Sequence, residues 1–367
     1  MDFSPTVDDT SGGRDRHTWT ARHYRPPWWL RGAHGQTLAG KFLRPAPDSM
    51  LETERLDTPD GDFLDIAWMP ETDPNAPLVL VLHGLEGHTR RGYMVQTLLA
   101  LADCGMRGVG MNFRGCSGEM NRKPRFYHSG ETEDLGFVFG LLRRRFPTRP
   151  LMAIGFSLGG NILLKFLGER GANDAPAFSA AVAISVPYDL SAGADALERR
   201  GMTRVYAGYF LRSLVAKVRA KKEILANVLD LEAVWASATI RDFDDAATAK
   251  LHGFSGAEDY YHKSSSSRFV QSIRVPTLLI HARDDPFLPP AALPLPTIEA
   301  NPFLTLVLTD GGGHVGFLEG GLPWNPTFWV EEQIASFLAH CHQGASPTNS
   351  DATPISPGWV DPNTENL

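Results

Sequence analysis

The sequence predicts an α/β protein whose mainly parallel β-sheet is covered by helices on both faces. Short apolar runs bounded by turn residues alternate with segments of helical periodicity, as in a chain of βαβ units. The run LVLVL at residues 78–82 is apolar at every position, which is typical of a strand buried on both faces. The alternation stops at about residues 188–268, where no convincing strand occurs. That segment therefore predicts a helical insertion between two strands of the sheet.

The composition limits the classes of function. A formal net charge of -7 and the lack of a dominant basic stripe argue against a general nucleic-acid binder. The cysteines Cys104, Cys116 and Cys341 form no CxxC pair, which fits a reducing compartment without a disulfide framework or zinc site. No apolar run approaches the roughly 20 residues of a spanning helix, and the polar, acidic N-terminal residues are not expected to act as a signal peptide. We expect a cytoplasmic monomer with no integral membrane segment, metal or cofactor.

The individual elements follow from local pattern. Asp60-Gly61 predicts the turn of a β-hairpin over residues 51–70. Helical periodicity gives the remaining helices, and apolar runs give the remaining strands. The predicted helices are residues 93–102, 132–146, 160–167 and 328–339. The predicted strands are residues 78–82, 108–113, 151–156, 180–185, 276–282 and 304–309.

The domain boundaries follow from composition and from the insertion. Residues 21–343 are expected to form one domain, and the polar segments 1–20 and 344–367 are expected to be disordered. The natural place for the insertion is a cap over the carboxyl edge of the sheet. Its residues Tyr206, Phe210 and Leu214 could line an acyl pocket, although packing of the cap on the core explains them equally well.

A glycine-flanked serine is the first candidate for chemistry. GFSLGG, at residues 155–160, contains the pattern GxSxG between a predicted strand and a predicted helix, where a nucleophile elbow requires it. The flanking glycines suit a strained turn that exposes Ser157. The competing interpretation is an ordinary glycine-rich turn, which the strand-turn-helix context disfavours. Ser157 is therefore the predicted nucleophile.

A serine hydroxyl needs a base and an orienting acid. The loop ARDDPFLPP after one predicted strand supplies Asp284 and Asp285, and GGGHVGF after the next supplies His314. The chain order serine, acid, histidine is that of a nucleophile-elbow enzyme. Asp285 is preferred because it directly precedes a proline bend, whereas Asp284 could cap a turn. The pattern thus predicts a triad of Ser157, Asp285 and His314.

An oxyanion hole requires two backbone N–H groups. Leu158, directly after the nucleophile, is expected to supply one, and Leu85 in the loop HGLEGHTRRGY is expected to supply the other. His83 and His88 in that loop lack the HExxH spacing, so a metal site is not predicted. Cys116 in NFRGCSGE has no histidine placed to activate it, which favours a buried or semi-exposed thiol.

The segment RPPWWLRGAHGQT, at residues 25–37, stands apart from the regular pattern. It could be a membrane foot, a part of the site or a structural clasp. Two prolines and two tryptophans in a non-periodic stretch favour a segment laid against the core, with the indoles covering apolar surface. We interpret it as a clasp that borders the acyl pocket, and His34 is not expected to take part in the chemistry.

Eight segments together resemble the YheT-like branch of the α/β-hydrolases, and they span about residues 25–320, nearly the whole predicted domain. The resemblance implies an eight-stranded α/β-hydrolase fold with a helical cap, and a triad on Ser157, Asp285 and His314. Relatives in this branch include ester-forming and ester-cleaving enzymes and lipid hydrolases, so it narrows the reaction more than the substrate. The segments are RGAHGQT, HGLEGHTRRGY, NFRGCSGE, GFSLGGNILLKFLGE, RDFDD, YYHKSSS, ARDDPF and GGGHVGF.

The leading hypothesis is a serine esterase that cleaves short- to medium-chain acyl esters through an acyl-enzyme on Ser157. An acyltransferase with an alcohol acceptor and a hydrolase of acylglycerols or phospholipids remain alternatives with the same site. A non-catalytic binding module is disfavoured by the complete, correctly ordered triad. The basic amphipathic stretch RSLVAKVRAKK, at residues 212–222, allows attachment to anionic lipid, but a solvated outer face of the cap is preferred.

Overall fold

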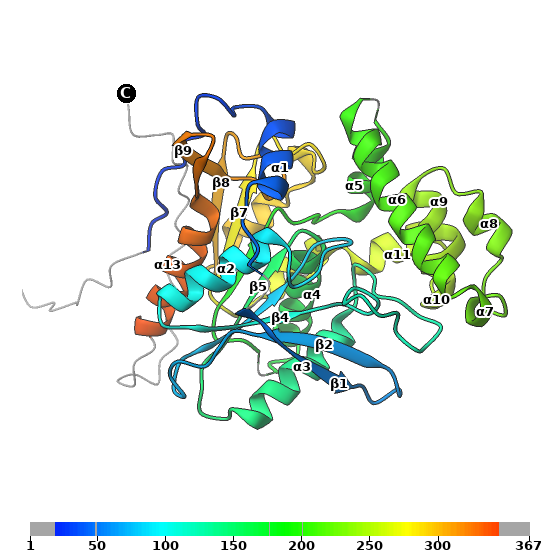
Figure 1. Ribbon diagram of the computed structural model, residues 1–367, viewed down its shortest axis with the longest axis horizontal. Coiled ribbons are helices and arrows are strands. Elements are labelled where there is room, and N and C mark those ends of the chain that lie inside the picture. Colours follow the sequence, from blue (N-terminus) through cyan, green and yellow to red (C-terminus); the bar gives the residue numbers. More distant parts are fainter. Residues whose placement is uncertain (1–18, 48–49, 176, 200, 345–367) are drawn as a thin grey trace, which may run out of the picture.

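The computed structural model describes residues 19–47, 50–175, 177–199 and 201–344. An eight-stranded sheet forms its centre, in the order β1-β2-β4-β3-β5-β6-β7-β8 (Figure 1). Strands β1 and β2 pair antiparallel, β2 joins β4 antiparallel, and all remaining neighbours are parallel. The predicted α/β class with a mostly parallel eight-stranded sheet is confirmed.

Each predicted strand is present to within one or two residues. The hairpin turns at Gly61, whose φ of 78° lies in the left-handed region that glycine adopts without strain. The strands are β1 (Glu52–Asp57), β2 (Phe63–Trp68), β3 (Leu78–Leu82), β4 (Arg107–Met111), β5 (Leu151–Phe156), β6 (Ala181–Ile184), β7 (Thr277–Ala282) and β8 (Leu304–Thr309).

Helices cover both faces of the sheet, so the central strands are buried on both sides. Apolar residues of α2 (Gly92–Asp103) and α13 (Trp329–Gly344) pack on one face. Those of α3 (Thr132–Arg145), α4 (Leu158–Ala172) and α12 (Leu295–Ala300) pack on the other. Every residue of β3 is at most 1% exposed. This two-sided burial is why the sequence of β3 is uniformly apolar rather than alternating.

The insertion between β6 and β7 consists of helices, and we call residues 188–268 the cap (Figure 1). It has a small core of its own, built around Val218, Leu225, Val234 and Phe243. Two short 3-10 turns, Ser266–Arg268 and Val270–Ser272, lead back to β7. The cap helices are α5 (Leu190–Glu198), α6 (Met202–Ala220), α7 (Lys222–Leu225), α8 (Leu231–Trp235), α9 (Ile240–Phe243), the π-helical turn Asp244–Thr248, α10 (Ala249–Leu251) and α11 (Ala257–Ser264).

The structure agrees with the preferred solvated face for Arg212, Arg219 and Lys222, which are exposed, and corrects it for the other two cations of the basic stretch, Lys217 and Lys221. Both interpretations of that stretch required its lysines to face solvent. Lys217 instead binds Glu86, with 2.7 Å between Nζ and Oε1, and Lys221 is 5% exposed and donates to Asn121 Oδ1 at 3.0 Å. Lys222 is exposed. Lys217 on α6 and Lys221 directly after it therefore point toward the core, where buried acceptors bind their ammonium groups.

The segment before the hairpin is also more regular than predicted. Residues Ala33–Phe42 form helix α1, although their sequence lacks a clear apolar period. Trp28 does not cover the core as expected: it is 72% exposed, and its Nε1 donates to the carbonyl of Gly321. That carbonyl belongs to a second sheet that was not predicted, the hairpin of β9 (Leu318–Leu322) and β10 (Asn325–Phe328).

The described residues begin at Trp19 and end at Gly344. The segments predicted to be disordered, residues 1–20 and 344–367, lie almost wholly outside the described residues. Trp19 is described, and its ring packs edge-on against Phe337 of α13. Among the described residues, no helix combines the length and the apolar character that crossing a bilayer requires.

Candidate active site

Ser157 lies at the turn between β5 and α4. Its backbone has φ 52° and ψ −117°, a strained conformation for a residue with a side chain. The turn is also tightly packed: a Cβ at Gly155 would lie 2.5 Å from the carbonyl oxygen of Gly159, and one at Gly159 would lie 2.6 Å from that of His83. The two flanking glycines are thus required by close backbone approach, and the strained turn presents the Ser157 hydroxyl to a cavity.

The His314 ring joins Ser157 to Asp285. His314 Nε2 lies 2.9 Å from Ser157 Oγ, and Nδ1 lies 2.8 Å from Asp285 Oδ2. The Asp285 side chain is 0% exposed, and its other oxygen accepts the amide of Phe287 at 2.9 Å. Since the loops after β7 and β8 start at the carboxyl edge of a parallel sheet, they bring these side chains to the elbow after β5. The three predicted residues lie together.

The structure separates the roles of the two aspartates in ARDDPF. Asp284 does not contact the imidazole; its Oδ1 accepts the amide of Gly313 at 2.8 Å, one residue before His314. Burial raises the pKa of Asp284, against the lowering effect of that hydrogen bond. Asp284 therefore holds the backbone of the His314 loop, whereas Asp285 orients the ring itself.

Two backbone amides beside Ser157 remain open. In the loop after β3 the amide of Gly84 donates to Tyr93 Oη and that of Glu86 to Tyr127 Oη, both at 2.9 Å. Gly84 itself lies against Ser157, since a Cβ on it would be 3.2 Å from the serine Cβ. Leu85 N makes no hydrogen bond to the described part of the chain. Leu158 opens helix α4, so its amide has no acceptor within the helix.

A cavity of about 450 Å³ extends from Ser157 beneath the cap. The predicted substrate-binding residues Tyr206, Phe210 and Leu214 all lie on α6 and line it. Phe287 was not predicted as part of the site, and its ring packs between the rings of His314 and Tyr206. Its ring centroid is 4.5 Å from that of His314 and 4.9 Å from that of Tyr206. An aromatic layer therefore connects the imidazole to the cap.

Helix α1 holds the loop that carries His314. Thr37 Oγ1 accepts the His314 amide at 2.9 Å, and Gln36 exchanges hydrogen bonds with both backbone groups of Leu318. Arg44 donates to the carbonyls of Val315 and Gly316 at 3.0 and 2.7 Å. The segment predicted as a clasp thus has a more specific structural role, because its Gln36 and Thr37 hold the backbone at Leu318 and His314, and Arg44 farther along the chain holds the residues between them.

His34, in the same segment, points toward the cap. Its Nδ1 lies 3.4 Å from Tyr206 Oη, and the two ring centroids are 5.8 Å apart. The residue therefore contacts a wall of the cavity and makes no described contact with Ser157, Asp285 or His314.

The comparisons with known proteins agree with this fold. The sequence profile of the α/β hydrolase fold matches residues 77–321. YheT of Escherichia coli is 40% identical over 323 residues, which is 87% of this chain and 94% of that protein. The chain belongs to the α/β-hydrolase fold family, in its YheT-like branch.

Two further proteins show how far the likeness of this hydrolase extends. Phospholipase ABHD3 of Mus musculus is 31% identical over 330 residues, which is 87% of this chain and 80% of the relative. Among solved structures, the esterase Pf2001 of Pyrococcus furiosus has a TM-score of 0.50 at 18% identity, covering 80% of this chain and 91% of its own. The structural likeness supports the fold.

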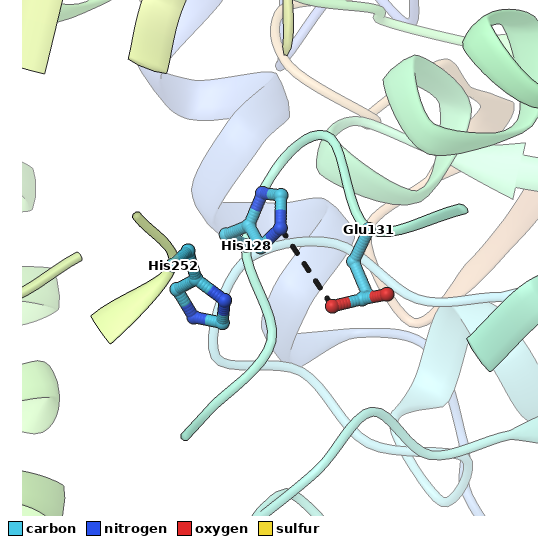
Figure 2. A group of neighbouring side chains, drawn as sticks. All are labelled: His128, Glu131 and His252. Atoms are coloured by element: carbon cyan, nitrogen blue, oxygen red, sulfur yellow. Dashed lines mark ion pairs between the residues drawn. The ribbon is translucent and has the colours of Figure 1, made fainter. Parts of the chain in front are cut away.

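Two histidines and a glutamate of the hydrolase lie close enough together to be compared with a metal site. Figure 2 shows His128, Glu131 and His252 close together, and their potential ligand atoms lie within 4.8 Å of one another. The Gly130 amide donates to His128 Nδ1 at 3.1 Å, so the proton of the neutral ring sits on Nε2, which faces Glu131 at 3.6 Å. Arg125 already binds Glu131 at 2.6 Å. This donor set suits a hydrogen-bonded network better than a cation.

His83 and Cys116, in the loops that follow β3 and β4, are both buried. His83 is fully buried with its Nε2 accepting the Phe113 amide at 3.2 Å, and burial lowers its pKa to about 3. Cys116 is buried, and burial raises the pKa of its thiol to about 11 despite the nearby Lys217 ammonium. Neither residue faces the Ser157 hydroxyl as a rival for its chemistry.

Sequence reasoning missed Thr37, Arg44 and Phe287 as parts of the site. Phe287 lies in the quoted loop ARDDPFLPP, two residues after Asp285, so its proximity could have been found from the loop. Thr37 lies in RGAHGQT, which was recognised as typical of the family but assigned only a clasp role. Arg44 carried no signal, since a lone arginine is usually a surface residue.

Proposed function

We propose that this hydrolase cleaves carboxylic esters of short- to medium-chain acids through an acyl-enzyme on Ser157. The observation that carries the proposal is the chain of hydrogen bonds from Ser157 Oγ through His314 to Asp285, at 2.9 and 2.8 Å, at the edge of an apolar cavity. A buried carboxylate on Nδ1 holds the neutral imidazole with Nε2 free to accept a proton. That is the arrangement a serine nucleophile needs.

In the acylation step Ser157 Oγ attacks the ester carbonyl carbon while its proton passes to His314 Nε2. Asp285 stabilises the imidazolium that forms. Collapse of the tetrahedral intermediate breaks the bond to the alcohol oxygen, which takes the proton from His314. In deacylation a water molecule gives its proton to His314 and attacks the acyl carbon, and Ser157 recovers the proton as the acid leaves.

The amides of Leu85 and Leu158 are the proposed donors to the oxyanion. The neighbouring amides in the loop after β3 support this assignment, because the amides of Gly84 and Glu86 already donate to tyrosine hydroxyls. Donors that stand ready before the reaction stabilise the developing charge without reorganisation; losing one typically costs about 100- to 1,000-fold in turnover. Tyr206, Phe210 and Leu214 are proposed to contact the acyl chain.

The size and lining of the cavity support the substrate range. A volume of about 450 Å³ holds a small ligand but leaves little room for two long chains. The relatives' names point the same way at a coarser level: YheT carries a provisional esterase assignment and ABHD3 that of a phospholipase. Both describe ester cleavage. A lipid-like ester with one short chain is therefore the second candidate substrate.

Two measurements test the proposal. A fluorophosphonate probe should label the wild type and leave Ser157→Ala unlabelled, and no labelling of a folded wild type would refute the role of Ser157. Hydrolysis of p-nitrophenyl esters of increasing chain length should show an optimum at short to medium acyl chains. A rate that climbs steadily to the longest chains would contradict the proposed acyl pocket.

The proposal extends to the cellular setting. The enzyme is proposed to act as a cytoplasmic monomer on diffusing esters. Sedimentation of the purified protein would test the oligomeric state, and fractionation of cells would test the location.

A further inference from the structure

Two cations line the solvent-exposed end of the cavity without a carboxylate partner. Lys41 comes from the last turn of α1, and Arg91 directly precedes α2; both line the same cavity as Ser157. Neither forms an ion pair with any residue in the described part of the chain. Arg44, the third cation of the lining, differs in being neutralised by Glu331 at 2.6 Å. The lining therefore has an excess of positive charge at one place.

The positive charges converge on Tyr209 of α6. Lys41 Nζ lies 4.2 Å from the centroid of that ring, and the ring is 42% exposed. Burial alone would raise the pKa of Tyr209, yet the charges of Lys41 and Arg91, together with their side-chain hydrogen bonds to Tyr209, lower it below its usual value. The two cations thus act at the same point, from a helix and a loop on the core side, facing the cap across the cavity.

The acidic residues of the cavity do not neutralise this positive end. Glu86 is bound by Lys217 at 2.7 Å and also accepts the hydroxyl of Ser213. Asp244 is held by Thr248 and Tyr261, and burial raises its pKa to about 6. Because both carboxylates are already engaged, no acidic side chain of the described lining is available to pair with Lys41 or Arg91.

We infer that Lys41 and Arg91 form a subsite for an anionic group, a carboxylate or a phosphate, on the alcohol portion of the ester. The inference rests on the proposed function. Phe210, Leu214 and Phe287 give the cavity an apolar wall that suits the acyl chain, which leaves the alcohol portion of the ester for Lys41 and Arg91. Guanidinium and ammonium groups bind carboxylate and phosphate oxygens through charge-assisted hydrogen bonds. The substrate class is then an ester whose leaving group carries negative charge.

A purely structural role for Lys41 and Arg91 predicts a different result. If Lys41 and Arg91 only tied α1 and α2 to Tyr209 of the cap, their loss would affect neutral and anionic esters alike. A subsite instead predicts a loss that depends on the charge of the substrate. The comparison of matched esters separates the two.

The experiment uses 4-butyryloxybenzoate, 4-butyryloxyphenyl phosphate and the neutral 4-butyryloxybenzamide, which share one acyl chain. The full-length enzyme is compared with Lys41→Gln, Arg91→Gln, the double variant and Lys222→Gln, a matched loss of an exposed cation outside the cavity. The quantity measured is kcat/KM for each anionic ester divided by kcat/KM for the neutral ester, 4-butyryloxybenzamide. The three esters differ in leaving-group reactivity, but that difference is the same for every variant and so cancels when variants are compared.

The expected result is a fall in that ratio of about tenfold for each single variant and about 100-fold for the double variant. Lys41→Arg and Arg91→Lys should restore most of it, and Lys222→Gln should leave it near the wild-type value. In the wild type the ratio should fall with added salt, because the subsite is partly exposed and screened. The anionic ester that loses more identifies carboxylate or phosphate as the preferred group.

Equal losses on anionic and neutral esters, or a ratio unaffected by the double variant and by salt, would overturn the subsite. Either result, with the amide ester still cleaved, leaves the proposed function standing. If the wild type cleaves none of the three esters and resists the fluorophosphonate probe, both proposals fall.

Discussion

The hydroxyl of Thr37 accepts a hydrogen bond from the backbone amide of His314 at 2.9 Å, across 277 residues of sequence. Thr37 also donates to the carbonyl of Ala33, so its oxygen is fixed on helix α1. Packing is equally close at the neighbouring residue: a Cβ on Gly313 would lie 2.4 Å from the Ala33 carbonyl oxygen. The position of the imidazole is therefore decided partly by a helix that precedes the whole sheet.

Replacing Thr37 by Val should impair turnover more than substrate binding. Valine leaves the His314 amide without its acceptor, and a small displacement of the imidazole is costly in a preorganised site, so kcat/KM should fall about 10- to 100-fold. Thr37→Ser should retain most activity, since it keeps the hydroxyl. Unchanged kinetics in Thr37→Val would refute the positioning role.

His34→Ala, on the same helix, should lower stability yet leave fluorophosphonate labelling intact.

The two aspartates of ARDDPF should respond very differently to amidation. Asp285→Asn removes the charge that orients the imidazole and should lower kcat/KM by about 10,000-fold, by analogy with other serine triads. In Asp284→Asn the carboxamide oxygen can still accept the Gly313 amide, so the loss should stay within about tenfold. Steady-state kinetics on p-nitrophenyl butyrate measures both. Equal losses would mean that the assignment of the acid is wrong.

Breaking the Arg44–Glu331 pair should be strongly destabilising. Both side chains are nearly inaccessible, at 1% and 3% exposed. Arg44→Met leaves a buried carboxylate and removes the donor to two carbonyls of the His314 loop, so unfolding free energy should drop by about 3–5 kcal/mol. Arg122→Met, which breaks a solvent-exposed pair with Asp57, should cost no more than about 1 kcal/mol. Urea unfolding compares them, and similar losses would contradict the role of burial.

Asp244 should make stability depend on pH in the acid range. Burial raises its pKa from 3.8 to about 6 in the folded protein, so between these values the native state binds more protons than the unfolded chain. The contribution is therefore present below pH 4 and is lost as pH rises through 6, by about 3 kcal/mol at most. Asp244→Asn should flatten this fall. The check is the difference in unfolding free energy between the two proteins from pH 4 to pH 7, and a difference independent of pH would refute it.

Several features of the fold could be predicted from the sequence, because they depend only on residues that are neighbours in the chain. The apolar run of β3, the hairpin turn at Gly61 and the glycines around Ser157 each satisfy a local backbone requirement. Helix α1 was missed for the converse reason. Its sequence has no apolar stripe, since what it buries against the His314 loop is largely polar, as with Gln36.

The amino-acid sequence was enough to predict the α/β class and the strand-turn-helix at Ser157, because strand periodicity and turn chemistry depend on residues that are neighbours in the chain. The sequence favoured Asp285 over Asp284 as the partner of His314, and the fold places Asp285 there. The inward turn of Lys217 to Glu86 and the contact of Thr37 with the His314 amide became visible only in the fold. The physical reason is the same in each case. These contacts join segments far apart in the chain, and a hydrogen bond or buried charge is chosen by what lies opposite it in space.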